Sequence, residues 1–222
     1  MIEFCPFENT AGGFVGREAS RLKDFNLAPQ DFFQLTQVHG DRIVRITETV
    51  EAASLRKTEG DALVTDRPRV PIAVRAADCV PILIAHPDRI VAAVHAGWKG
   101  TQAEVLKKTL DFLRKEMGVD LSKARLAIGP AICGRCYEVG EEVASAFSRF
   151  PEQVTALSVE KFLLDLKAIN LHLALEAGVD ASKIEVRPEC TLCDEKKFYS
   201  YRGEMKRGEK GEGRNVAWVM LR

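Results

Sequence analysis

The chain has 222 residues, of which 46% are hydrophobic and 29% are charged. These values are typical of a folded globular protein and exclude disordered, collagen-like and coiled-coil chains. The 32 basic residues balance 32 acidic ones, so net charge gives no reason to expect nucleic acid or an anionic membrane as a partner. No apolar run reaches the roughly 18 residues of a membrane helix, and residues 1–6 do not resemble a signal peptide. We therefore expect a cytoplasmic protein with one domain over residues 1–222.

Hydrophobic patterning predicts an alternation of strands and helices. Runs dense in Val, Ile and Ala predict strands buried on both faces at 71–76, 80–85 and 90–95. Shorter strands are predicted at 43–47, 62–65, 125–128, 184–187 and 216–221.

Apolar residues at helical spacing predict a helix that ends at Gly118, with Thr101 as its N-cap and Glu104 at capping-box spacing. Further helices are predicted at 138–150 and from Phe162 to Gly178. The glycine-rich, charged stretch 202–214 is predicted to be a mobile loop. The mixture indicates an α/β or α+β fold, a single-domain layered sandwich with a mainly buried mixed sheet and flanking helices.

Three segments place a possible metal ligand beside a predicted strand end, where sheet proteins often carry their sites. The ligands are His39, Cys79 and His95. Two imidazoles and one thiolate suit zinc and leave a fourth tetrahedral position for water or substrate, as in catalytic zinc sites. The three residues are far apart in the sequence, so hydrogen-bonded structural histidines and a packed cysteine remain open as an alternative.

The segments QVHG at 37–40, ADCVP at 77–81 and HAGWKG at 95–100 resemble, in this order, three signatures of the laccase-domain, YfiH-like family. Later segments at 128–130, 137–139, 165–166, 190–191, 198–202 and 213–214 agree with this family. The resemblance implies a zinc site at His39, Cys79 and His95, and it implies purine nucleoside chemistry. Family members cleave adenosine, inosine and methylthioadenosine with phosphate, and some deaminate adenosine.

Other functions stay open at this point. The family was earlier described as a copper-dependent polyphenol oxidase, and a role in editing cell-wall precursors has also been proposed for it. The chain has four histidines, which fits an oxidase with several coppers poorly, although copper is an alternative metal for the same ligands. A hydrolase with Cys79 as nucleophile and His95 as base and a metal-storing module are further alternatives.

The substrate implied by the resemblance is a small-molecule purine nucleoside, with phosphate as co-substrate. Arginine side chains bind phosphate through paired hydrogen bonds, and an aromatic ring can stack on a purine. For Trp98 a core position, for Asp78 a turn cap and for the arginines a surface position are the structural alternatives. The expected substrate-binding residues are Gln37, Asp78, Trp98, Tyr137, Arg202 and Arg214.

Two Cys-x-x-Cys pairs, at 133–136 and 190–193, form a second question. Two such pairs can hold a closed tetrathiolate zinc, a redox pair is another use of this spacing, and disulfides or free thiols are the remaining alternatives. Of the four cysteines, the family resemblance includes Cys190 alone.

The start of the chain departs from the family pattern. Gly12 and Gly13 follow Asn-Thr-Ala, whereas the family usually has Thr-Arg before this glycine pair. Arg17 and Arg21 are the nearby candidates to replace the missing arginine.

Overall fold

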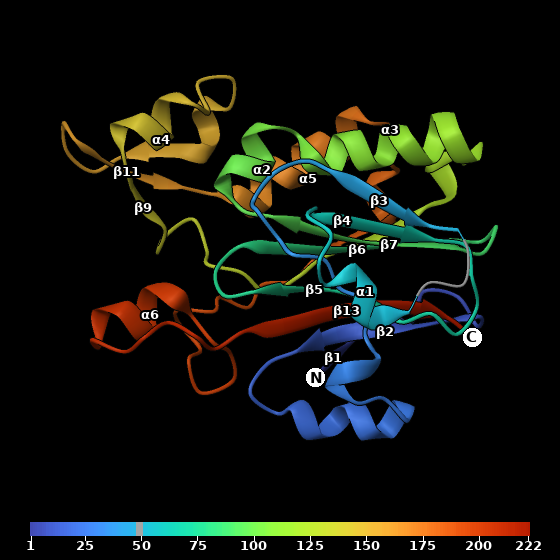
Figure 1. The fold of residues 1–222 in the computed structure, drawn as a ribbon. Helices are drawn as coiled ribbons and strands as arrows, with labels where there is room; N and C mark the ends of the chain where they lie inside the picture. The colour runs from blue at the N-terminus through green and yellow to red at the C-terminus, as the bar shows by residue number, and fades with distance from the viewer. Residues whose placement is uncertain (48–50) are drawn as a thin grey trace.

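A mixed six-stranded sheet forms the centre of the protein in a computed structural model that describes residues 1–47 and 51–222 (Figure 1). The side chains of residues 19–21 are outside this description. The two edge strands pair in parallel with their neighbours, and the inner pairs are antiparallel. In spatial order the strands are β12 (Ile184–Val186), β8 (Arg125–Ile128), β6 (Val80–His86), β7 (Ile90–Ala96), β4 (Ala62–Thr65) and β3 (Ile43–Ile46).

A second, antiparallel sheet packs against one face of the first. Its strands are, in spatial order, β1 (Ile2–Glu3), β2 (Thr10–Val15), β13 (Asn215–Leu221) and β5 (Ile72–Ala76). Alternation along β6 explains the layering, because Leu83 belongs to the core between the sheets whereas Ile82 and Ile84 belong to the core on the opposite face. The strand is therefore buried on both faces, as its uninterrupted apolar sequence predicts.

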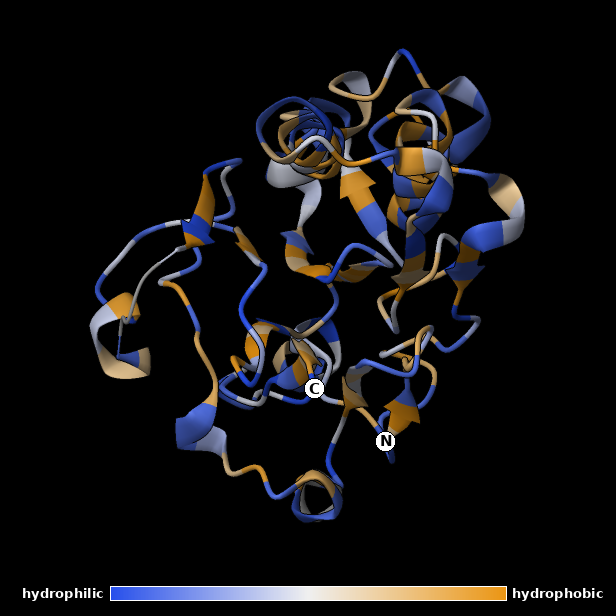
Figure 2. Ribbon diagram, turned by 90° about the vertical axis from the view of Figure 1, so that its right-hand side faces the viewer, coloured by the Kyte–Doolittle hydropathy of each residue, from blue (hydrophilic) through white to orange (hydrophobic). Residues whose placement is uncertain are grey.

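Helices cover the other face of the six-stranded sheet (Figure 1). They are α2 (Trp98–Gln102), α3 (Val105–Met117) and α5 (Leu166–Glu176). In α3, Leu106, Leu110 and Leu113 are fully buried at helical spacing, and Gly118 ends the helix with φ +68°. The helical ribbons at the top of Figure 2 accordingly carry both hydrophobic and hydrophilic residues.

The remaining elements are short. A small antiparallel sheet contains β10 (Val154–Ala156), β11 (Lys161–Leu164) and β9 (Glu138–Gly140). The other helices are α1 (Ala52–Leu55), α4 (Glu141–Ser145) and α6 (Tyr201–Lys206). The 3₁₀ helices are η1 (Ala19–Phe25), η2 (Pro29–Asp31), η3 (Leu121–Lys123), η4 (Pro151–Gln153) and η5 (Ala181–Lys183).

The predicted fold class, a mixed layered sandwich with flanking helices, is confirmed. The strands predicted at 62–65 and 125–128 have the observed bounds. The strands are, however, divided between two large sheets. The chain passes from one sheet to the other between β5 and β6, which hydrophobicity alone does not reveal because both strands are buried.

The predicted start of the helix after Thr101 is wrong. Thr101 lies inside α2, where its N–H donates to the carbonyl of Gly97. Glu104 separates α2 from α3 in a left-handed conformation with φ +57°. The capping-box spacing therefore coincides with a break between two helices.

Three other segments also differ from the prediction. The helix predicted at 138–150 begins with β9, and α4 occupies only part of the rest. Phe162 belongs to β11, so the following helix begins after Asp165, whose side chain caps it. The segment 202–214 is not entirely a loop, because α6 covers its first residues with Ser200 as N-cap.

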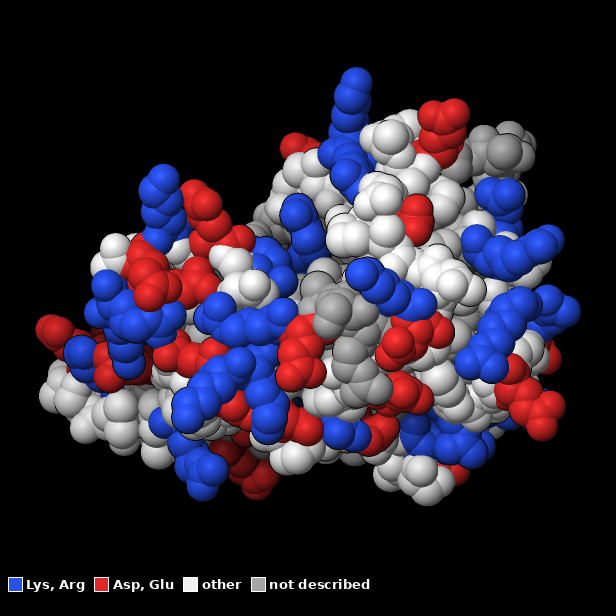
Figure 3. All heavy atoms as spheres, turned by 90° about the horizontal axis from the view of Figure 1, so that it is seen from below, with Lys and Arg blue, Asp and Glu red and all other residues white. Residues whose placement is uncertain are grey.

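No helix among the described residues is long and apolar enough to cross a membrane. The face seen in Figure 3 carries acidic and basic side chains interspersed, consistent with the zero formal net charge.

Candidate metal centre

The structure brings His39, Cys79 and His95 together. Their possible ligand atoms all lie within 4.8 Å of one another. His39 precedes β3, Cys79 lies in the connection between β5 and β6, and His95 lies near the end of β7. Pro81 of β6 is paired with His95, so the antiparallel ladder carries Cys79 to the same end of the sheet. The two imidazole rings meet edge to face, with centroids 4.9 Å apart.

A buried carboxylate, Asp61, organises two of the three side chains. It accepts hydrogen bonds from the backbone N–H groups of Val38, His39 and Gly40 at 3.2, 3.0 and 2.8 Å. A fourth bond, of 2.8 Å, joins its Oδ1 to Nδ1 of His95. Because an ionised carboxylate only accepts, Nδ1 carries the proton and Nε2 is left as the ligand atom.

Electrostatics favour the metal-binding form of the thiol. Burial raises the pKa of a thiol, but the hydrogen bonds and charges of His39 and His95 outweigh it and lower the pKa of Cys79 to about 6. Burial lowers the pKa of His95, but Asp61 and Cys79 outweigh it and raise that pKa to about 9. Cys79 is therefore mainly thiolate at neutral pH, and the thiolate is the form that binds metal.

Gly97, the N-cap of α2, leaves the space that the cluster needs. A Cβ atom at this position would lie 3.0 Å from Sγ of Cys79 and 3.1 Å from Cδ2 of His39. Its φ of −72° suits any residue. We expect Gly97→Ala to leave the chain folded and to weaken zinc binding by about 10–100-fold, as displaced ligand geometry does elsewhere.

A competition titration with a chromophoric chelator measures this effect. Gly140→Ala is the matched control, because Gly140 is also a helix N-cap and a Cβ there meets nothing within 4 Å. Equal zinc affinity in both variants would contradict the expectation.

A cavity of about 620 Å³ opens onto the cluster and is lined by His39, Cys79 and His95. Its other polar lining is cationic or neutral, and no Asp or Glu of the described residues lines it. The guanidinium group of Arg75 has no hydrogen bond or ion pair to the described part of the chain. The cavity is therefore suited to an anion. The arginines on its wall are Arg56, Arg75 and Arg214.

A smaller cavity of about 230 Å³ adjoins the same cluster, since His39 and Cys79 line it as well. Its walls are largely aromatic and apolar, formed by Trp98, Tyr137, Tyr201, Ile132 and Leu166, and the charged residues Asp78 and Arg202 also line it. Such walls suit a planar heterocycle. Burial, followed by the charge of Cys79, raises the pKa of Tyr137 to about 12, so the phenol keeps its proton at neutral pH.

The expected substrate-binding residues lie around these two cavities. Arg202 stacks over the Tyr137 ring with 5.2 Å to its centroid, and its side chain donates to the carbonyl of Glu138. Arg214 lies at the larger cavity and donates to two backbone carbonyls of its own loop.

Two of these residues have contacts that the sequence did not indicate. Both amide atoms of Gln37 are bonded to the backbone of Arg75, at 2.7 and 2.8 Å. The carboxylate of Asp78 accepts from the hydroxyl of Thr191 at 2.6 Å and from the N–H of Arg202 at 2.7 Å. Among the described residues, no hydrogen bond joins Asp78 to His39 or His95. The carboxylate that bonds a histidine ring is that of Asp61.

The sequence reasoning missed Asp61, Arg56 and Arg75. An acidic residue directly before the predicted strand at 62–65 is the signal for Asp61. Arg17 does not replace the missing family arginine at the site, because its side chain donates to the carbonyls of Glu195 and Phe198 and stacks on Tyr199. The side chain of Arg21 lies outside the described residues.

Comparisons with known proteins agree with this fold and with the family resemblance. Residues 14–222 match the family described as multi-copper polyphenol oxidoreductase laccase. The chain is 35% identical over 197 residues to a purine nucleoside phosphorylase of Synechocystis, covering 77% of this chain and 74% of that protein. It is 33% identical over 208 residues to an adenosine deaminase of an unknown prokaryotic organism, covering 85% and 79%. The crystal structure of the hypothetical protein YfiH of Bacillus licheniformis matches with a TM-score of 0.86 at 27% identity, covering 96% and 93%. The chain therefore belongs to the laccase-domain, YfiH-like family.

Proposed function

We propose that the protein is a zinc-dependent purine nucleoside phosphorylase that acts on adenosine, inosine and methylthioadenosine with phosphate as co-substrate. The observation that carries the proposal is the cavity that joins the His39, Cys79 and His95 cluster to three arginines, with no carboxylate of the described residues on its wall. Relatives named purine nucleoside phosphorylase support the reaction class.

The donor set fits zinc. One thiolate and two imidazoles are common zinc ligands, and the hydrogen bond from Nδ1 of His95 to Asp61 is the outer contact that metal-binding histidines usually make. When bound, zinc supplies a Lewis acid with an open position for substrate. The roles of His39, Cys79 and His95 are to hold that ion at the junction of the two cavities.

Phosphate belongs in the larger cavity. Phosphorolysis forms a bond from a phosphate oxygen to C1′ of the ribose and breaks the glycosidic bond, so the anion must be held without competing carboxylates. The guanidinium of Arg75, which has no partner in the described part of the chain, provides paired donors for it, with Arg56 and Arg214 on the same wall.

The purine belongs in the smaller cavity, between Trp98 and Tyr137. The leaving base must take up a proton, and stacking together with a hydrogen-bond donor stabilises it. The protonated phenol of Tyr137 is such a donor. Asp78 holds the backbone of Arg202 beside this cavity, and Gln37 fixes the backbone of Arg75 beside the other.

Release of free base from a nucleoside panel, measured with and without phosphate, tests the proposal. Zinc and copper are quantified in the same sample. We expect base release that requires phosphate and scales with zinc content. Base release independent of phosphate, or no release by fully zinc-loaded protein, would contradict it.

Deamination of adenosine is a second candidate activity, favoured by the relative named adenosine deaminase. Conversion of adenosine to inosine without phosphate, followed in the same panel, separates it from phosphorolysis.

Thiol alkylation separates the metal centre from a Cys–His hydrolase. In metal-free protein we expect iodoacetamide to modify Cys79 at a rate that rises with pH through about 6 and then levels off, following the thiolate. Zinc is expected to protect Cys79, because a metal-bound sulfur is a poor nucleophile. Peptide mass spectrometry locates the modification, and equal modification of Cys79 with and without zinc would favour the hydrolase.

We expect no phenol oxidation by zinc-loaded protein. Zinc has no redox chemistry, and the three-ligand cluster holds one ion, whereas reduction of oxygen to water takes four electrons. Copper can occupy the same ligands, so weak oxidation after copper treatment is compatible with the proposal. The measurement is oxygen consumption with a phenol substrate by protein that holds only zinc. A rate of oxygen consumption above the rate of phosphorolysis would support the oxidase instead.

Two further proposals concern the whole chain. Strands from both ends of the sequence, β2 and β13, pair in one sheet, which supports a single domain over residues 1–222. A cytoplasmic location stays a prediction from the sequence.

A further inference from the structure

The two Cys-x-x-Cys pairs meet in space, although 53 residues separate them. The sulfur atoms of Cys133, Cys136, Cys190 and Cys193 all lie within 4.8 Å of one another. Sulfur atoms bound at about 2.3 Å to a tetrahedral zinc ion lie about 3.8 Å apart. All six cysteines of the chain are free thiols, and the sulfur atoms of Cys136 and Cys193 lie 3.4 Å apart.

Backbone hydrogen bonds hold each pair in a tight turn. The N–H of Cys136 donates to the carbonyl of Cys133, and the N–H of Asp194 donates to the carbonyl of Cys190. A bridge between Ala131 and Cys190 joins the two turns. The N–H of Cys133 also points at Sγ of Cys190, 3.3 Å away. Such a donor stabilises a thiolate, so the backbone is arranged for charged sulfur.

We propose that Cys133, Cys136, Cys190 and Cys193 bind a structural zinc ion, separate from the His39, Cys79 and His95 cluster. Four thiolates complete a tetrahedron, so this ion has no open position and no part in the chemistry. Soft thiolate ligands select zinc over the hard cations magnesium and calcium.

This ion also has a structural role near Cys79. Both of the turns that it joins form hydrogen bonds with Asp78, which precedes Cys79 in the chain. The N–H of Ile132 donates to the carbonyl of Asp78, and the hydroxyl of Thr191 donates to its carboxylate. The ion thus fixes two loops that bind Asp78, and the first of them contributes Ile132 and Tyr137 to the wall of the smaller cavity.

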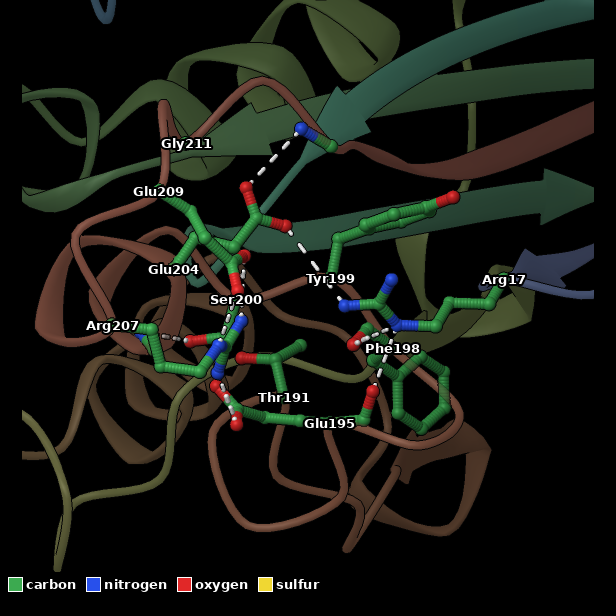
Figure 4. A network of polar contacts seen from close by, with 12 residues as sticks. Arg17, Thr191, Glu195, Phe198, Tyr199, Ser200, Glu204, Arg207, Glu209 and Gly211 are labelled. Carbon is green, nitrogen blue, oxygen red and sulfur yellow. Dashed lines mark hydrogen bonds and ion pairs between the residues drawn. The ribbon is translucent and has the colours of Figure 1, made fainter.

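The far side of the second turn is anchored by polar contacts (Figure 4). Arg17 donates to the carbonyl of Glu195 at 2.8 Å, and the side chain of Glu195 pairs with Arg207. The segment after Cys193 is therefore tied to Arg17, which follows β2, and to Arg207, which follows α6. Among the described residues, the bridge at Ala131 and the hydrogen bond from Thr191 to Asp78 hold the cysteine side of the loop. A metal ion at the cysteines adds a direct link between the two turns.

Metal counting on the full-length protein tests the proposal. Protein is saturated with zinc under reducing conditions, desalted, and measured for zinc per chain. We expect two zinc ions in the wild type and one in Cys193→Ser, whose exposed side chain is outside the core. Cys5→Ser, at another exposed cysteine, is the control and is expected to keep two. His39→Ala is expected to lose the other ion, so failure of one site is distinguishable from failure of the other.

Two further measurements keep the test decisive if Cys193→Ser does not fold. Cobalt-loaded His39→Ala protein should show the intense sulfur-to-cobalt absorption of a tetrathiolate site, which an empty cluster lacks. Denatured, unreduced wild-type protein should have the mass of a chain with free thiols. The proposal would be overturned by a mass that shows disulfides or by equal zinc content in wild type and Cys193→Ser. It would also be overturned if cobalt-loaded His39→Ala lacked this absorption.

Discussion

Replacement of His39 by Ala is expected to remove zinc from the His39, Cys79 and His95 cluster and to reduce base release by more than about 100-fold, since changes in outer contacts of metal ligands already cost 10–100-fold. His39 is exposed and its side chain belongs to no core cluster. The fold should therefore persist. His39 already has a left-handed conformation, with φ +60°, and Ala carries a Cβ as His does, so the exchange adds little backbone strain.

Zinc content, kcat/KM for base release and circular dichroism measure the outcome. His172→Ala is the matched control, because His172 is exposed on α5, away from the cluster, and pairs with Glu176. His95 is less suitable for this test, since it is buried and bonded to Asp61. Wild-type turnover in zinc-free His39→Ala protein would show that the ion is not catalytic.

Replacement of Asp61 by Ala is expected to have the largest effect on stability. Asp61 is fully buried, and its carboxylate bonds three backbone N–H groups and the ring of His95. Removing it leaves these donors without a partner inside the protein. Breaking a buried charged pair of this kind costs about 3–5 kcal/mol, and the loop that carries His39 loses its anchor.

Urea unfolding of metal-free protein measures this free energy, so that zinc binding does not contribute. Asp66→Ala is the control, because Asp66 makes an exposed ion pair with Arg45 and such pairs contribute about 0–1 kcal/mol. A loss of less than about 1 kcal/mol in Asp61→Ala would mean that Asp61 does not hold the site together.

Strands were the most predictable part of the fold. In β6 and β7 every residue is buried, so the apolar run in the sequence directly reflects the environment of each side chain. The segment 138–150 was predicted wrongly because its structure depends on a distant partner. Glu138 and Val139 pair with Leu163 and Phe162 of β11, and a contact between segments so far apart leaves no periodic signal.

Only the site residues that lie in sequence motifs were predictable. The resemblance indicated His39, Cys79 and His95, and the structure brings them together. The carboxylate of Asp61 bonds four nitrogen atoms of other residues, and one acidic residue before a predicted strand is a weak sequence signal for such a role. The meeting of the two Cys-x-x-Cys pairs likewise depends on the bridge between Ala131 and Cys190, which joins turns distant in sequence.

The position of Cys79 between the two large sheets has a thermodynamic consequence. The chain leaves β5 in one sheet, passes through Cys79 and enters β6 in the other, whereas His95 lies in β7. A ligand that contacts His39, Cys79 and His95 together binds the folded protein, in which the two sheets are packed, and not the unfolded chain. By mass action, such a ligand at 100 times its dissociation constant raises the free energy of unfolding by about 2.7 kcal/mol. The melting temperature of this protein should therefore be read as a function of free ligand concentration rather than as a constant of the chain.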